Sequence, residues 1–258
     1  MEQNILSQVQ AAVTELASQP NVSRPSADEI RRAAESFGLK TQFGNYSFVS
    51  SIKNRSAGVT VYVGGPGVAH TTLTQKRREI LNSLPETLRL VHSYMKKAPF
   101  VQVKATMGDN DVFSPKCTLY MSTYRKEMVR LAHMVNQTLF PSANKPGPDF
   151  NIIFIPEWQE KDRQILVFPE IGVTYVLGSD YYGEAKKGFL RMGMWHAKQQ
   201  GMLGLHAGTK IIRARNKGGK LQRLGMVIFG LTATGKTTHS CHSHDLNGDD
   251  EGVEIVQD

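Results

Sequence analysis

Cysteine is scarce in this sequence, and long apolar runs are missing from it. Cys117 and Cys241 are the only cysteines among 258 residues, too few for the disulfide framework of a small secreted domain. No stretch of about 18 uncharged apolar residues occurs, so we expect no membrane-spanning helix and no membrane partner. The first residues carry neither a basic segment nor a following apolar one, which argues against a secretory signal. We therefore expect a cytoplasmic protein.

Internal repeats and low-complexity segments are also missing, so the chain should fold as one large or two ordinary domains. The formal net charge of +8 calls for a negatively charged partner. Lys and Arg are spread along the chain and the aromatic residues show no stacking pattern, so we expect no nucleic-acid partner. ATP together with a dicarboxylate would also suit a basic cleft, and charge alone leaves this choice open.

Hydrophobic spacing predicts a mixed α/β fold. Helices are expected over residues 1–19, 26–37, 71–97 with a break near Pro85, after the strand 117–121 with an apolar stripe from Met128 to Leu139, and 184–192, with Ser26 as an N-cap. In the fourth helix the methionines at helical spacing are expected to fill the core. Strands are expected over residues 48–52, 59–63, 100–103, 117–121, 150–155, 164–169, 172–177, 203–206, 210–214 and 226–229. We place a domain boundary near Gly201, which gives domains 1–201 and 202–258, and a hairpin turn at 216–220.

A phosphate-binding loop is the strongest motif. Residues 226–229 read as a buried strand, Gly230 breaks it, and Gly235, Lys236 and Thr237 complete the pattern G-x-x-x-x-G-K-[ST]. Such a loop directs backbone N–H groups at phosphate oxygens, while the lysine reaches the β- and γ-phosphates and the threonine hydroxyl a divalent metal. A Gly/Thr-rich turn that fits the pattern by chance is the alternative, and the preceding strand favours the loop.

Other polar features have an ordinary explanation beside a functional one. Lys186 and Lys187 stand in the first turns of a helix, where cations oppose the helix dipole, and on charge alone they read as a solvated helix start. Asp249 and Asp250 form an acidic turn or a carboxylate pair for metal ions near the nucleotide. A soft-ligand cluster could hold zinc instead, but no second group of ligands with matching spacing is evident: His239, Cys241, His242 and His244.

With these features in view, the chain resembles the ATP-dependent phosphoenolpyruvate carboxykinases. In that family a Tyr-Gly-Gly-Glu-x-Lys-Lys-Gly segment precedes a short strand ending in His. A Phe-Gly-Leu-Ser-Gly-Thr-Gly-Lys-Thr-Thr loop and a Gly-Asp-Asp-Glu segment follow. The corresponding segments here are 181–188, 205–206, 229–238 and 248–251, and the arginine turn at 54–57 and residues 148–150 are similar too. The resemblance implies an N-terminal oxaloacetate-side domain followed by the start of a P-loop nucleotide-binding domain.

The activity that the resemblance implies is the conversion of oxaloacetate and ATP into phosphoenolpyruvate, ADP and CO2, with Mn2+ beside the substrate and Mg2+ on the nucleotide. Arg55 and Tyr181 would bind oxaloacetate, with Arg55, Lys186 and Lys187 as the catalytic residues. Lys186 would stabilise the enolate, and Lys187 would also contact substrate. The metal ligands implied are Lys187, His206, Asp250, Thr237 and Asp249. The nucleotide-binding residues implied are Gly230, Leu231, Thr232, Ala233, Thr234, Gly235, Lys236, Thr237 and Thr238.

The sequence departs from the family pattern in several places. Ala233 and Tyr182 replace family glycines, and no proline follows the Arg55 turn. Beyond the position of Asp258 the family continues with the rest of the nucleotide domain, so we expect a portion of a longer protein or a shortened relative. The alternative to the enzyme is a non-catalytic ATP-binding or regulatory module of the same fold. No pattern in the sequence indicates an oligomeric state.

Overall fold

The computed structural model describes residues 2–52, 56–68, 72–159, 163–230, 234–246 and 248–257. The chain divides into two compact units, residues 1–196, called the first unit here, and 197–258, called the second unit. Among the described residues, no helix is both long enough and apolar enough to cross a membrane. The assignment of 1–201 to an oxaloacetate-side domain and 202–258 to the start of a nucleotide domain stays a prediction.

The first unit alternates helices and strands, as expected. Its helices are α1 (Glu2–Leu16), α2 (Ala27–Glu35), α3 (Gln75–Met95), α4 (Val129–Thr138) and α5 (Tyr182–Gln199), which runs on into the second unit. Its strands are β1 (Val22–Ser23), β2 (Leu39–Lys40), β3 (Tyr46–Ser47), β4 (Thr60–Tyr62), β5 (Phe100–Thr106), β6 (Lys116–Ser122), β7 (Phe140–Pro141), β8 (Asp149–Ile155), β9 (Gln164–Phe168) and β10 (Val173–Leu177).

The main sheet of the first unit has eight strands, in the order β1-β5-β6-β8-β10-β9-β4 with β7 beside β5. The central strands β6, β8 and β10 run parallel, whereas β5–β6 and β9–β10 are antiparallel pairs. The predicted mixed α/β class is therefore confirmed.

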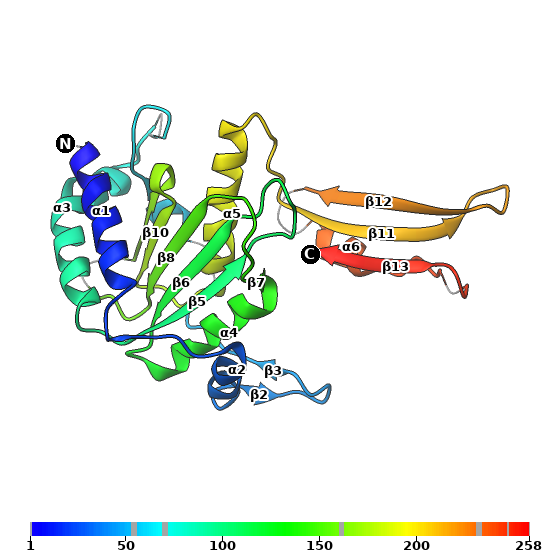
Figure 1. Ribbon diagram of the computed structural model, residues 1–258, viewed down its shortest axis with the longest axis horizontal. Helices are drawn as coiled ribbons and strands as arrows, with labels where there is room; N and C mark the ends of the chain where they lie inside the picture. The colour runs from blue at the N-terminus through cyan, green and yellow to red at the C-terminus, as the bar shows by residue number, and fades with distance from the viewer. Residues whose placement is uncertain are drawn as a thin grey trace. The chain divides into compact units, whose positions relative to one another are not determined.

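Helices cover both faces of this sheet (Figure 1). In β8, Ile152 and Phe154 pack on one face with α2, α4 and α5, while Ile153 and Ile155 pack on the other with α1 and α3. All four side chains are fully buried. A parallel strand that is buried on both faces carries a continuous apolar run, which is why this stretch was readable from the sequence.

Two helix predictions had different outcomes. The N-cap of α2 is confirmed, because Ser26 accepts the amide of Glu29 at 3.2 Å and the Glu29 carboxylate accepts the amide of Ser26 at 2.7 Å. The predicted break near Pro85 is wrong, since α3 continues through it. Proline removes one helical hydrogen bond, but the neighbouring Leu84 and Leu88 are buried against the sheet and hold both sides of the proline in the helix.

The strand predicted over residues 48–52 is also wrong. The chain leaves the small β2–β3 ladder after Ser47, and the described residues 48–52 pair with no strand. The backbone amides of Ser51 and Ile52 donate to the carboxylate of Asp180 instead. A side chain that is far away in sequence has therefore replaced the expected ladder partner.

The second unit is a three-stranded antiparallel sheet with one short helix. Its elements are β11 (Ala207–Arg215), β12 (Leu221–Phe229), α6 (Lys236–Cys241) and β13 (Gly252–Gln257), with strand order β12-β11-β13. The predicted turn at 216–220 is confirmed and closes with a 3.0 Å bond from the Asn216 amide to the Lys220 carbonyl.

Two expectations for this unit are corrected. Residues 203–206 form no strand, because the ladder with β12 ends at the pair of Ala207 and Phe229 and does not reach them. The strand before the phosphate loop exists, but it is not buried: Met226 is 38% and Phe229 68% exposed. Within this unit β12 is an edge strand that pairs with β11 alone.

Candidate functional site

The start of α5 lies at the carboxyl end of the central strand β10. In open α/β sheets, ligands bind at this edge of the parallel strands. Tyr181 directly precedes α5, and Lys186 and Lys187 occupy its first two turns, all three half-buried. The Tyr181 ring packs on the backbone of Gly183, where a Cβ would come within 2.4 Å of the ring. This edge of the sheet therefore holds three of the predicted substrate-side residues.

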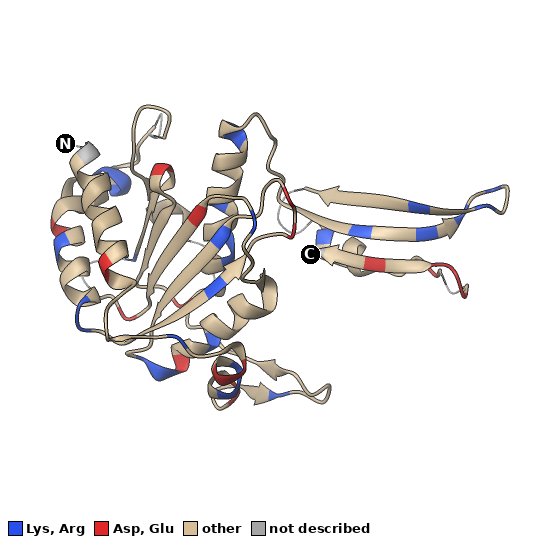
Figure 2. Ribbon diagram, in the orientation of Figure 1, with Lys and Arg blue, Asp and Glu red and all other residues tan. Residues whose placement is uncertain are grey.

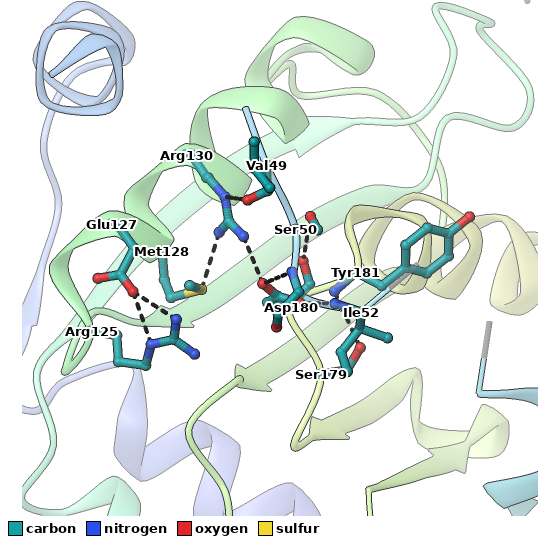
Figure 3. Close-up of polar contacts among 11 residues, drawn as sticks. Val49, Ser50, Ile52, Arg125, Glu127, Met128, Arg130, Ser179, Asp180 and Tyr181 are labelled. Carbon is teal, nitrogen blue, oxygen red and sulfur yellow. Dashed lines mark hydrogen bonds and ion pairs between the residues drawn. The ribbon is translucent and has the colours of Figure 1, made fainter. Parts of the chain in front are cut away.

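Asp180, next to Tyr181, is the centre of a buried polar network (Figure 3). Its Oδ2 accepts the Ser51 amide at 2.8 Å and its Oδ1 the Ile52 amide at 2.9 Å. Arg130 on α4 donates from Nη2 to the same carboxylate at 2.8 Å and from Nε to the Val49 carbonyl at 3.2 Å. The side chains of Asp180 and Arg130 are 3% and 4% exposed, so this ion pair is shielded from water.

The electrostatics of Asp180 follow from these contacts. Burial by itself would raise the pKa of the carboxyl group, but the hydrogen bonds from Ser51 and Ile52 and the charge of Arg130 outweigh burial and hold the pKa below its ordinary value. Asp180 is therefore ionised at neutral pH.

Glu184, in the first turn of α5, repeats this arrangement. Its Oε1 accepts the amide of Ser56 at 2.7 Å, and its Oε2 lies 3.6 Å from Nη2 of Arg191 on the same helix. Glu184 is only 1% exposed. The Arg191 guanidinium in turn lies 6.0 Å from the ring centroid of Tyr62. Each buried carboxylate at the start of α5 thus has an arginine partner.

The other predicted residues of this part of the chain are placed as follows. Arg55 lies outside the described residues, although Ser56 beside it is described. Tyr182, which replaces a family glycine, turns toward α4, where its hydroxyl contacts the Thr138 hydroxyl and donates to the Met134 carbonyl at 3.2 Å. Its ring packs against the core on that face of the sheet.

In the second unit, β12 leads to Gly230 and α6 begins at Lys236, the strand–loop–helix order expected of a phosphate loop. Gly235 caps the helix with a φ of 83°, which a residue with a side chain rarely adopts. The Lys236 ammonium group donates to the Gly230 carbonyl at 3.0 Å and spans the loop. Thr237 and Thr238 are exposed on α6. Thr234 is exposed, and three loop residues of the prediction lie outside the described ones: Leu231, Thr232 and Ala233.

His206 and the acidic pair lie at opposite ends of β11. His206 directly precedes the strand, at the end where Ala207 pairs with Phe229. Asp250 pairs with Arg215 at the other end, and the Arg215 amide donates to the neighbouring Glu251 at 2.7 Å. A strand of nine residues that rises about 3.3 Å per residue separates them by roughly 30 Å. The structure therefore brings His206, but not Asp249 or Asp250, to the phosphate-loop end.

Lys210 on β11 is a residue that the sequence reasoning missed. It is 1% exposed, and its ammonium group contacts the His239 carbonyl, the His242 carbonyl at 3.3 Å and Nε2 of His244 at 2.6 Å. Burial, with the charge of Lys210 next in importance, lowers the pKa of His244. Within the described ranges, no group of three or more His, Cys, Asp or Glu could hold a metal ion.

Comparison with known proteins agrees with the motifs. A family model described as phosphoenolpyruvate carboxykinase matches residues 32–255. The phosphoenolpyruvate carboxykinase (ATP) of Aeropyrum pernix is 35% identical over 166 residues, which cover 64% of this chain and 32% of that protein. The Dictyostelium discoideum protein of the same name is 42% identical over 79 residues, 30% of this chain and 13% of that protein. The glycosomal protein of Trypanosoma cruzi is 40% identical over 79 residues, 30% of this chain and 15% of that protein.

The chain thus spans about a third of the length of the Aeropyrum relative and less of the other two. The family model nevertheless covers most of this chain, including α5, the phosphate loop and the acidic turn. The chain belongs to the ATP-dependent phosphoenolpyruvate carboxykinase family.

Proposed function

We propose that this chain takes part in the conversion of oxaloacetate and ATP into phosphoenolpyruvate, ADP and CO2. The observation that carries the proposal is the placement of Tyr181, Lys186 and Lys187 at the carboxyl edge of the parallel strands. An anionic dicarboxylate fits a helix start that carries two cations. Membership of the family supplies the reaction class.

In the proposed reaction, the carbon–carbon bond to the leaving carboxylate of oxaloacetate breaks and its electron pair passes into an enolate. Lys186 stabilises the negative charge on the enolate oxygen, while Arg55 and Tyr181 hold the substrate. The enolate oxygen then attacks the γ-phosphorus of ATP and ADP leaves. Lys236 neutralises the transferring group, and the loop residues 230–238 cradle the triphosphate.

A divalent metal belongs to the family's chemistry, where it would stabilise developing negative charge. The finer proposal assigns Mn2+ to Lys187, His206 and Asp250, and Mg2+ to Thr237 with support from Asp249. Nitrogen and carboxylate donors suit such ions. His206 and Asp250 are nevertheless at opposite ends of β11, so this set does not fit as it stands, and no step above depends on it.

The test is the formation of phosphoenolpyruvate from oxaloacetate and ATP in the presence of Mn2+. We expect Lys187→Met and Lys236→Met to abolish the activity and the control Lys220→Met, in the exposed hairpin turn, to retain it. Calorimetry separates the enzyme from a non-catalytic ATP-binding module: ATP affinity that is unchanged by oxaloacetate and Mn2+ would favour the module. A cytoplasmic location remains part of the proposal.

A further inference from the structure

Two buried carboxylates fasten a stretch of irregular chain to the start of α5. Asp180, just before the helix, accepts the amides of Ser51 and Ile52 at 2.8 and 2.9 Å. Glu184, in the first turn, accepts the amide of Ser56 at 2.7 Å. The two acidic residues are 3% and 1% exposed. Ser51, Ile52 and Ser56 are therefore each bonded to the start of α5.

This stretch has no other regular support among the described residues. Positions 48–52 belong to no strand, and only a single 3-10 turn at Ala57–Val59 precedes β4. Ser56 is buried, and a buried backbone amide needs an acceptor; the amides of Ser51, Ile52 and Ser56 all have a side-chain carboxylate as that acceptor. The position of the stretch relative to α5 is thus set mainly by the two carboxylates.

Both carboxylates are themselves held in place. Arg130 on α4 binds Asp180 at 2.8 Å, and Arg191, one face of which is covered by the Tyr62 ring, lies 3.6 Å from Glu184. A carboxylate fixed by a second partner transmits its position to the amide that it accepts. Figure 3 shows Asp180 between α4 and the 49–52 stretch, where it joins the two.

We propose that Asp180 and Glu184 are positioning residues for the substrate end of the carboxykinase site, an inference that rests on the proposed function. They hold the helix start that carries Tyr181 and Lys187 against Ser51, Ile52 and Ser56. Arg55, which belongs to this stretch in sequence, lies outside the described residues. Substrate groups must be placed to within a fraction of an ångström for the chemistry to proceed, so loosening either bond weakens substrate binding.

The anchoring is tested by hydrogen–deuterium exchange on the full chain, with no ligand present. Asp180→Asn should speed exchange in the peptide containing Ser51 and Ile52, and Glu184→Gln in the peptide containing Ser56, each by about tenfold or more. Glu170→Gln is the matched control, since this carboxylate also accepts a backbone amide, that of Gly65 at 3.1 Å.

The positioning role is tested by the affinity for phosphoenolpyruvate in the presence of Mn2+, measured by calorimetry on the same variants. We expect Asp180→Asn and Glu184→Gln to weaken binding by about tenfold or more, with unchanged circular dichroism, and Glu170→Gln to leave it unchanged. Glu184→Gln keeps an oxygen acceptor of the same length and serves as the second variant where Asp180→Asn fails to fold.

The outcomes are distinguishable. Faster exchange together with weaker binding supports the inference. Faster exchange with unchanged binding means that the carboxylates only stabilise the fold, and unchanged exchange means that they do not anchor the stretch; either result overturns the inference. A wild-type chain that binds neither phosphoenolpyruvate nor oxaloacetate with Mn2+ overturns the proposed function and this inference with it.

Discussion

Replacing Asp180 by Asn removes one charge from a buried ion pair and leaves the size of the side chain at this position almost unchanged. The Arg130 guanidinium, whose side chain is 4% exposed, would lose its anionic partner while remaining inside the protein. The Asn amide offers one oxygen to the Ser51 and Ile52 amides, which now use both carboxylate oxygens. The variant therefore loses an ion pair and at least one hydrogen bond together.

The cost follows from burial. Removing one partner of a buried pair destabilises a protein by about 3–5 kcal/mol, because the remaining charge stays uncompensated. A whole domain is stable by only about 5–15 kcal/mol. At about 2–4 °C per kcal/mol for a unit of this size, the melting temperature of the first unit should fall by about 6–20 °C.

Urea unfolding followed by tryptophan fluorescence measures this loss. The two tryptophans, Trp158 and Trp195, both lie in the first unit, so the signal reports on that unit. We expect Arg130→Met to destabilise the unit as well. The double variant should lose clearly less than the sum of the single losses, because the second change removes the orphaned charge.

An exposed ion pair provides the control. Glu86 and Arg89 lie 2.6 Å apart on α3 with side chains 60% and 66% exposed, and such pairs contribute little. Glu86→Gln should therefore leave the urea midpoint almost unchanged. Additive losses in the Asp180–Arg130 cycle, or a loss no larger than that of the surface control, would refute the reasoning.

The same pair predicts a pH dependence. The folded-state pKa of Asp180 lies below its ordinary value, so the unfolded chain binds the proton more readily than the folded one. Its contribution to stability is then fully present above the unfolded pKa and is lost as the pH falls through the folded pKa. Asp180→Asn should flatten the acid side of the stability curve, measured as urea midpoint against pH, relative to wild type.

Three further predictions concern single positions. Gly172→Ala should lower the free energy of unfolding of the first unit by about 1–3 kcal/mol through the left-handed backbone alone. The added Cβ should lower it further, because it would come within 2.2 Å of the Asp149 carbonyl oxygen. Urea unfolding measures the loss, and an unchanged midpoint would contradict the prediction. Lys210→Met should speed hydrogen exchange in α6, because the helix loses the buried ammonium group at its carboxyl end; unchanged exchange would contradict the contact. DTNB should modify Cys241 rapidly and Cys117 only after unfolding, since burial raises the pKa of the Cys117 thiol to about 12; two fast thiols would contradict this.

Elements that depend on local sequence patterns could be predicted from the sequence. The continuous apolar run of β8, the N-cap at Ser26 and the hairpin turn at 216–220 each depend on residues a few positions apart. The order of motifs around α5 and the phosphate loop also gave the family, which the comparison confirms. Periodicity and turn chemistry are local properties, and a single sequence displays them directly.

Features that depend on contacts between residues far apart in the sequence could not be predicted. The apolar alternation of Phe48 and Ile52 indicated a strand. The amides of Ser51 and Ile52 donate instead to Asp180, about 130 positions away. Pro85 indicated a break that packing of the flanking leucines overrides. The inward-facing lysine at position 210 looked like any polar residue of an exposed strand, because its partners come from the far end of α6.

The position of the acidic turn that follows the phosphate loop is set by the strand register, and not by its closeness to the loop in sequence. Asp250 follows the loop closely in sequence, yet β13 pairs antiparallel with β11, so the turn before β13 lies at the Arg215 end of β11. Its carboxylate Oδ2 is occupied by the Arg215 guanidinium, and a metal ion would have to displace that cation. A metal ion and the Arg215 guanidinium would therefore compete for the Asp250 carboxylate. Asp250 can therefore bind manganese through Oδ2 only if it releases Arg215, whereas His206 lies directly before β11, at the strand end that pairs with the end of β12.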